Sequence, residues 1–169
     1  MSLFKLGTIG AVLQTINNPR VQSAVVVKNG YVFNIVDGGT YKEQATAFVA
    51  DADAEKGNLY VAMNIIDTPE LWKQSDFAVA VGSYIRAFRL DSLIGVPVEM
   101  SSDLCITAFA GVAVGDVLVP AHSTDATPMA WKLQGASTTY AIGLKVLEKT
   151  TFGGTGFYCK VVQTSVKGA

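Results

Sequence analysis

The chain has 169 residues and a mass of 17.9 kDa; 50% of the residues are hydrophobic and only 16% are charged. This length suits one domain, or one domain with an arm, and allows a buried core. Lys and Arg total 13 against 14 for Asp and Glu, which argues against a nucleic-acid partner because such proteins need a dense basic surface. The high apolar content excludes intrinsic disorder.

Residues 1–20 are the only place for a signal peptide. Lys5 could begin one, but Gly7 and Gly10 interrupt the apolar stretch and no small-x-small cleavage site follows. No stretch approaches the roughly 18 apolar residues of a membrane span. We therefore expect a protein made in the cytoplasm, with no membrane partner.

In chain order, residues 1–22 are predicted to form an N-terminal arm on a β-rich body of residues 23–169. Apolar residues at i, i+3, i+4 and i+7 within residues 8–17, with Thr8 as a possible N-cap, indicate a short amphipathic helix. Because the segment is apolar and terminal, an extended arm lying along a partner is the alternative. The predicted partner-contact residues are Leu3, Phe4, Leu6 and Arg20.

The strongest hairpin signal follows the arm. Residues 24–28 and 31–36 are strand-like, and Asn29-Gly30 lies between them. This dipeptide tolerates the two positive φ angles of a type I′ turn. The pattern therefore predicts a hairpin of these two strands.

Strand-like segments continue to the C-terminus, interrupted by an acidic loop at 51–58 and a helical turn at 68–72. The later segments are 41–49, 59–66, 77–81, 84–90, 96–100, 104–109, 116–119, 129–133, 140–148 and 157–166. About ten short strands separated by turns predict a mainly β fold, as a sandwich or a barrel-like domain. A softer boundary near residues 101–103 would divide the body into two lobes.

Few residues in the chain are suited to catalysis or to metal binding. His122, in His122-Ser123-Thr124-Asp125, is the sole histidine, and adjacent loop residues rarely face one another as a Ser/His/Asp triad requires. An exposed loop histidine is therefore predicted. Asp51-Ala52-Asp53-Ala54-Glu55 begins like a calcium loop, but Lys56 replaces the required glycine. We predict no enzyme, no metal and no cofactor.

Cys105 and Cys159 are the two cysteines. A disulfide between them is possible, but buried thiols are the preferred prediction. Trp72 and Trp131 are either interface anchors or core residues.

Two further patterns have structural interpretations. Gly153-Gly154-Thr155-Gly156 lacks the lysine and the helix of a phosphate loop, so a hairpin loop is predicted. Arg86 and Arg89 flank Phe88, which favours a partly exposed strand face or a protein contact over base stacking.

The C-terminal third contains turn motifs that are found in a known family. Residues 110–120 have the sequence AGVAVGDVLVP, residues 141–147 are AIGLKVL, and VVQT follows at 161–164. These segments resemble the β-rich decoration, or cement, proteins that coat the capsids of tailed bacteriophages. In that family a Gly-Val-x-x-Gly-Asp turn and an Ala-x-Gly-x-(x)-Leu/Val strand recur.

The resemblance implies a non-enzymatic virion protein on the capsid surface, often a homotrimer, whose partners are the major capsid protein and copies of itself. Low charge and high apolar content agree with a subunit that buries much of its surface against neighbours. The alternatives are a phage tail-tube or other tail protein, and a carbohydrate-binding β module whose groove is lined by Trp72, Trp131 and the tyrosines.

Overall fold

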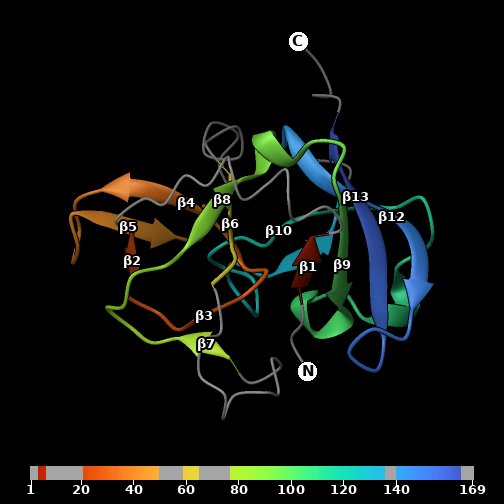
Figure 1. The fold of residues 1–169 in the computed structure, drawn as a ribbon, viewed down its shortest axis with the longest axis horizontal. Coiled ribbons are helices and arrows are strands. Elements are labelled where there is room, and N and C mark those ends of the chain that lie inside the picture. The colour runs from red at the N-terminus through yellow and green to blue at the C-terminus, as the bar shows by residue number, and fades with distance from the viewer. Residues whose placement is uncertain (1–3, 7–20, 50–58, 65–76, 136–139, 165–169) are drawn as a thin grey trace.

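The computed structural model describes residues 4–6, 21–49, 59–64, 77–135 and 140–164. The predicted fold class is confirmed, because the chain is mainly β and its curled sheets form a half-barrel (Figure 1). The helices of the described residues are 3-10 turns of three or four residues. In this part of the chain no helix has the length and apolarity to cross a membrane. The predicted helix at 8–17 and helical turn at 68–72 lie outside the described residues.

The larger sheet is built mainly from the C-terminal half and is antiparallel throughout. Its six strands are, in spatial order, β1 (Phe4–Leu6), β9 (Pro97–Ser101), β13 (Gly156–Gln163), β12 (Ile142–Thr150), β10 (Val117–Pro120) and β11 (Trp131–Leu133). The β12–β13 hairpin forms its centre, and the glycine-rich hairpin loop predicted from the sequence joins these two strands. Gly153 and Gly154 both have positive φ there, which glycine adopts without strain.

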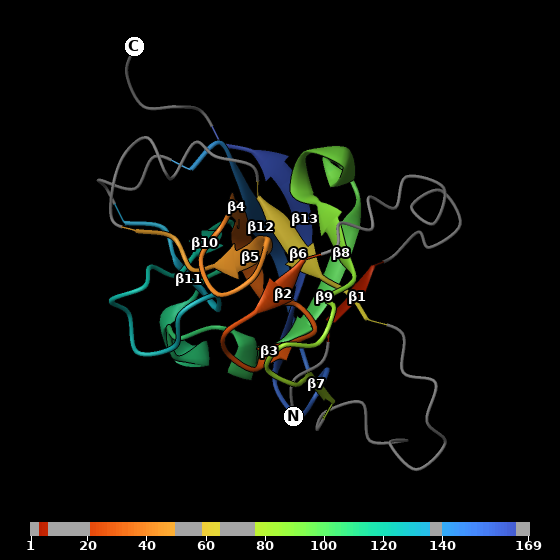
Figure 2. The same cartoon turned by 90° about the vertical axis from the view of Figure 1, so that its left-hand side faces the viewer.

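The smaller sheet comes from the N-terminal half. Its five strands are, in spatial order, β2 (Gln22–Ser23), β5 (Glu43–Thr46), β4 (Val32–Asp37), β6 (Tyr60–Ala62) and β8 (Ala87–Arg89). β2 runs parallel to β5, and the other pairs are antiparallel. Two further short strands, β3 (Val27–Lys28) and β7 (Ala78–Val79), pair with each other and lie side by side in Figures 1 and 2.

The predicted hairpin across Asn29-Gly30 is wrong, although a turn forms there. The Tyr31 N–H donates to the Lys28 carbonyl at 3.1 Å, and only Gly30 has positive φ, which fits a type II turn better than type I′. Asn29 ties this turn to Asn64, beyond the end of β6, through hydrogen bonds of 2.7 and 3.0 Å. The flanking strands therefore pair elsewhere, β3 with β7 and β4 with β5 and β6.

The strand predicted at 104–109 is also wrong. The segment runs from the end of one 3-10 turn, η5 (Ser102–Leu104), to the start of another, η6 (Phe109–Gly111). The Cys105 N–H donates to the Ser102 carbonyl at 3.0 Å, and the Ile106 N–H donates to the Trp131 carbonyl at 2.8 Å, so the segment makes a single bridge to β11 and not a strand. A short apolar run does not distinguish these two solutions.

One hydrophobic core holds the two sheets together. It joins Val61 and Phe88 of the smaller sheet to Leu118 and Leu144 of the larger one. Trp131 is fully buried in it, and its indole N–H donates to the Gly30 carbonyl at 2.8 Å. Trp131 is therefore a core residue. A second cluster of buried side chains, including Phe33 and Tyr60, lies against the smaller sheet.

Candidate functional site

The strand β1 places part of the predicted arm on the body of the same chain. β1 pairs with β9 at the edge of the larger sheet, with Phe4 opposite Met100. The half-buried Phe4 side chain contacts the glycine of the turn, since a Cβ added at Gly30 would lie 2.8 Å from Phe4 Cδ2 and 2.8 Å from Leu104 Cδ1. Glycine at this position thus makes room for the N-terminal strand.

Two of the four predicted partner-contact residues, Phe4 and Leu6, lie in β1. Phe4 packs on its own body and Leu6 lies in β1 opposite Val98. Leu3 and Arg20 lie outside the described residues. Their contact with a partner stays a prediction.

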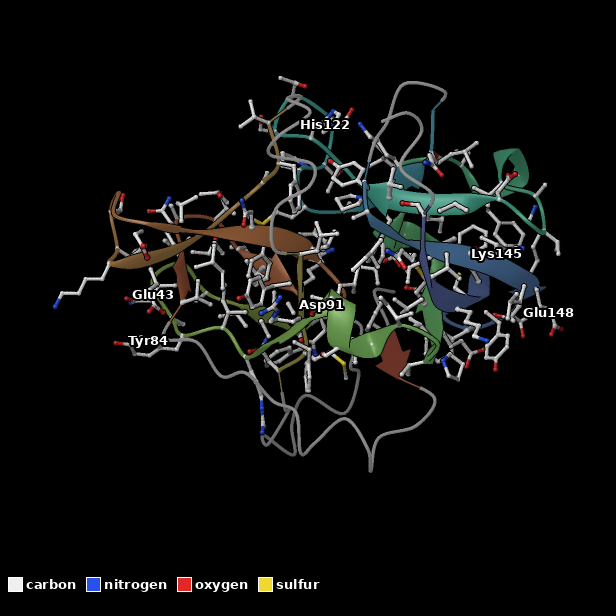
Figure 3. The ribbon with its side chains drawn as sticks, turned by 90° about the horizontal axis from the view of Figure 1, so that it is seen from above. Glu43, Tyr84, Asp91, His122, Lys145 and Glu148 are labelled. Carbon is white, nitrogen blue, oxygen red and sulfur yellow. The ribbon has the colours of Figure 1, made fainter. Side chains whose placement is uncertain are left out.

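An exposed apolar patch lies on two neighbouring loops beside the smaller sheet. We call it the loop patch; it consists of Val25, Val26, Val81 and Tyr84. These side chains are 51% to 66% exposed. The loops are joined by a hydrogen bond of 3.0 Å from the Gly82 N–H to the Ser23 carbonyl. Tyr84 lies at one end of the molecule and Lys145 toward the other (Figure 3).

A polar cluster of His122, Asp125 and Lys132 joins β11 to the loop that precedes it. The Lys132 ammonium lies 2.7 Å from Asp125 Oδ2 and 3.0 Å from His122 Nδ1. The backbone N–H of His122 donates to the same Asp125 oxygen at 2.6 Å. The prediction of an exposed loop histidine is therefore wrong. His122 is half-buried, and its ring centroid lies 6.0 Å from that of Tyr140.

The electrostatics of this cluster stabilise the charged carboxylate. Burial by itself raises the pKa of Asp125, but the hydrogen bonds from Lys132 and the His122 backbone and the charges of both residues outweigh it, so that the pKa is lowered. A Ser/His/Asp triad would need this carboxylate on an imidazole N–H. His122 Nδ1 lies 3.0 Å from the Lys132 ammonium, and the Lys132–Asp125 ion pair ties the loop to β11.

The two cysteines are free, buried thiols, as preferred from the sequence. Burial raises the pKa of Cys105, although Thr107 opposes the shift. Burial, with a contribution from the nearby Cys105, raises the pKa of Cys159 to about 12. Among the described residues no group of three His, Cys, Asp or Glu side chains could hold a metal ion. The acidic loop at 51–58 lies outside them.

The arginine–aromatic pattern does not form a stacking surface. Phe88 is only 3% exposed and belongs to the core. Arg89 is paired with Asp91 at 2.5 Å. Arg86 lies just before β8 and Arg89 at its end, and both are partly exposed.

The outer face of the larger sheet carries a charge pattern that sequence reasoning missed. Strand pairing aligns its side chains in two neighbouring rows. The acidic row begins at Lys5 of β1 and continues with Glu99, Tyr158 and Glu148, and the basic row is Pro97, Lys160, Lys145 and Val117. Both lysines are exposed and directly opposite each other on β12 and β13.

A β-bulge explains why the sequence did not reveal this alignment. The register of β12 against β13 shifts between Val146 and Glu148, leaving Leu147 without an opposite residue. Alternation places Lys145 outside, but only the shifted register brings it opposite Lys160.

Comparison with known protein families, with curated protein sequences and with solved structures finds no match to this chain. The structure itself defines a mainly β, half-barrel domain. Because a fold of this kind does not specify an activity, function has to be argued from its surfaces.

Proposed function

We propose that the chain is a non-enzymatic structural protein of a phage virion that binds and stabilises the capsid lattice, as decoration or cement proteins do. Its partners would be the major capsid protein and copies of itself. The proposal joins the resemblance of the C-terminal third to that family with one observation, the loop patch.

The loop patch supports a protein that is covered by neighbours. Isolated exposed apolar residues are ordinary, but four of them on two hydrogen-bonded loops are the kind of cluster found at protein contacts. Charged residues make up only 16% of the chain, which agrees with contacts based on shape and apolar area.

Stabilisation of a lattice does not require a strong single site. Each copy would contribute a modest apolar contact, and linkage between neighbouring copies would raise the overall avidity without any new type of contact. The capsid would then resist disruption because many such contacts have to break together.

The test is to add the purified chain to undecorated capsids of the virus that encodes it and to measure their disruption temperature. We expect binding and a higher disruption temperature. The variant Val81→Asp with Tyr84→Asp should lose both effects, because it places charge in the loop patch. The control Val49→Asp changes a side chain that is 60% exposed elsewhere and should bind normally.

Equal disruption temperatures with and without the chain would overturn the proposal. Rings or tubes of the purified chain in electron micrographs would instead favour the tail-protein alternative. The carbohydrate-binding alternative has lost one of its predicted groove residues, since Trp131 is fully buried.

A further inference from the structure

We infer that the outer face of β9, β13 and β12 is a self-complementary surface that binds the same face of a second copy of this chain. The inference concerns the self-association within the proposed function and does not depend on capsid binding. It is carried by the acidic and basic rows described above.

At the centre of this face, like charges lie next to each other within one copy. Lys145 and Lys160 are directly opposite each other, at a cross-strand Cβ separation of about 5 Å, an arrangement that is destabilising for like charges. Glu148 lies opposite Tyr158 of β13 and not opposite a lysine. Glu99 lies between Tyr158 of β13 and Lys5 of β1, so the unbalanced acidic charge of this face is that of Glu148. None of the ion pairs within the described residues involves these four charged side chains.

A two-fold rotation brings the opposite charges together. The rows run across the strands and lie about 7 Å apart, the repeat of two residues along a strand. Rotation by a half-turn about an axis in the plane of the face, parallel to the rows and midway between them, places the acidic row of one copy over the basic row of the other. Every contact then occurs twice, as in any two-fold interface.

The register specifies which side chains would meet. Glu148 and Lys145 belong to β12, so Glu148 of each copy would lie over Lys145 of the other. Tyr158 and Lys160 belong to β13, so the tyrosine ring would lie over an ammonium group, a favourable cation–π arrangement. The β12 pair is seen at the end of the molecule away from Tyr84 (Figure 3).

The shape and composition of the face agree with sheet-on-sheet packing. A rotation axis perpendicular to the strands keeps the two sets of strands aligned, and aligned packing of two sheets is a common arrangement. Leu147, which is 41% exposed at the bulge, and Tyr158, which is 36% exposed, supply apolar contact beside the charges. Because much of the attraction is between charges, the association should weaken in salt.

The experiment is analytical ultracentrifugation of the full chain from micromolar to millimolar concentration. We expect a monomer–dimer equilibrium that weakens at about 1 M salt, where charges are screened within about 3 Å. Lys145→Glu and Glu148→Lys should each lower the association constant by about tenfold or more, because each sets like charges against each other. Lys42→Glu, which reverses an exposed charge in the loop between β4 and β5, should leave the association constant unchanged.

Mixing the two variants provides the decisive measurement. Lys145→Glu carries only acidic side chains at these two positions and Glu148→Lys only basic ones, so each should self-associate weakly and the mixture should form a heterodimer of about wild-type affinity. A wild-type chain that is monomeric or trimeric throughout, or a mixture that fails to associate, would overturn the inference. Dimerisation without capsid binding would support it and overturn only the proposed function.

Discussion

The hydrogen bond from Trp131 to the Gly30 carbonyl leads to a quantitative prediction for Trp131→Phe. The bond joins β11 to the turn between β3 and β4, across 101 residues of sequence. Both residues are buried. Phenylalanine keeps an aromatic ring in the core but has no N–H to donate.

The expected loss of stability has two parts. A buried carbonyl left without its partner costs about 1–3 kcal/mol. The smaller ring removes packed atoms from a fully buried position, which adds about 1 kcal/mol. The predicted decrease in the free energy of unfolding is therefore about 2–4 kcal/mol, a large share of the roughly 5–15 kcal/mol of a typical domain.

The measurement is urea unfolding followed by far-ultraviolet circular dichroism, with Phe157→Leu as the control. Phe157 is also fully buried in the same core and its ring has no hydrogen bond to lose. Trp131→Phe should be the more destabilising of the two, with an unchanged dependence on urea concentration. A loss below about 0.5 kcal/mol, or one no larger than that of the control, would refute the role assigned to this bond.

Two further predictions concern titratable groups. Because burial raises the pKa of Cys105 and of Cys159, the latter to about 12, both remain protonated near pH 8 and should react with a thiol reagent only after unfolding. The pKa of Asp125 is lowered from the ordinary value of 3.8. Its contribution to stability is therefore present above that value and lost as the pH falls through the lower, folded-state pKa. Asp125→Asn should be less stable at neutral pH and should show a flatter acid dependence of the unfolding free energy.

A specific measurement would contradict each of the two predictions on titratable groups. Rapid labelling of either cysteine in the native protein, at the rate seen in denaturant, would contradict the burial of that thiol. Equal acid dependence in the wild-type chain and in Asp125→Asn would show that the pairing with Lys132 does not stabilise the fold.

The candidate surfaces were only partly predictable. Phe4 and Leu6 were selected as arm residues because they are apolar and near the terminus, a property that does not distinguish a partner from the chain's own sheet edge. In the structure, Phe4 packs against Gly30 at the edge of the chain's own sheet. The Lys132–Asp125 pair went unnoticed because its members are seven residues apart and meet only when β11 pairs with β10.

The sequence by itself determined the mainly β class and many of the strand positions, because alternation, β-branched residues and turn chemistry act within a few neighbouring residues. The glycine-rich loop between β12 and β13 was predicted for the same reason. Local chemistry also placed a turn at Asn29-Gly30, but not the partners of the strands on either side.

Only the tertiary structure decided which strands pair and in which register. β4 lies between β5 and β6, and β3 pairs with β7. The turn between β3 and β4 is held by groups distant in sequence: the Asn64 carbonyl accepts from the Asn29 side-chain amide, and the Trp131 indole N–H donates to the Gly30 carbonyl. Tertiary structure also decided which side chains are aligned on the outer face of β9, β13 and β12. A single unpaired residue in β12 sets Lys145 opposite Lys160, and such a shift depends on packing across the whole sheet, which no local pattern contains.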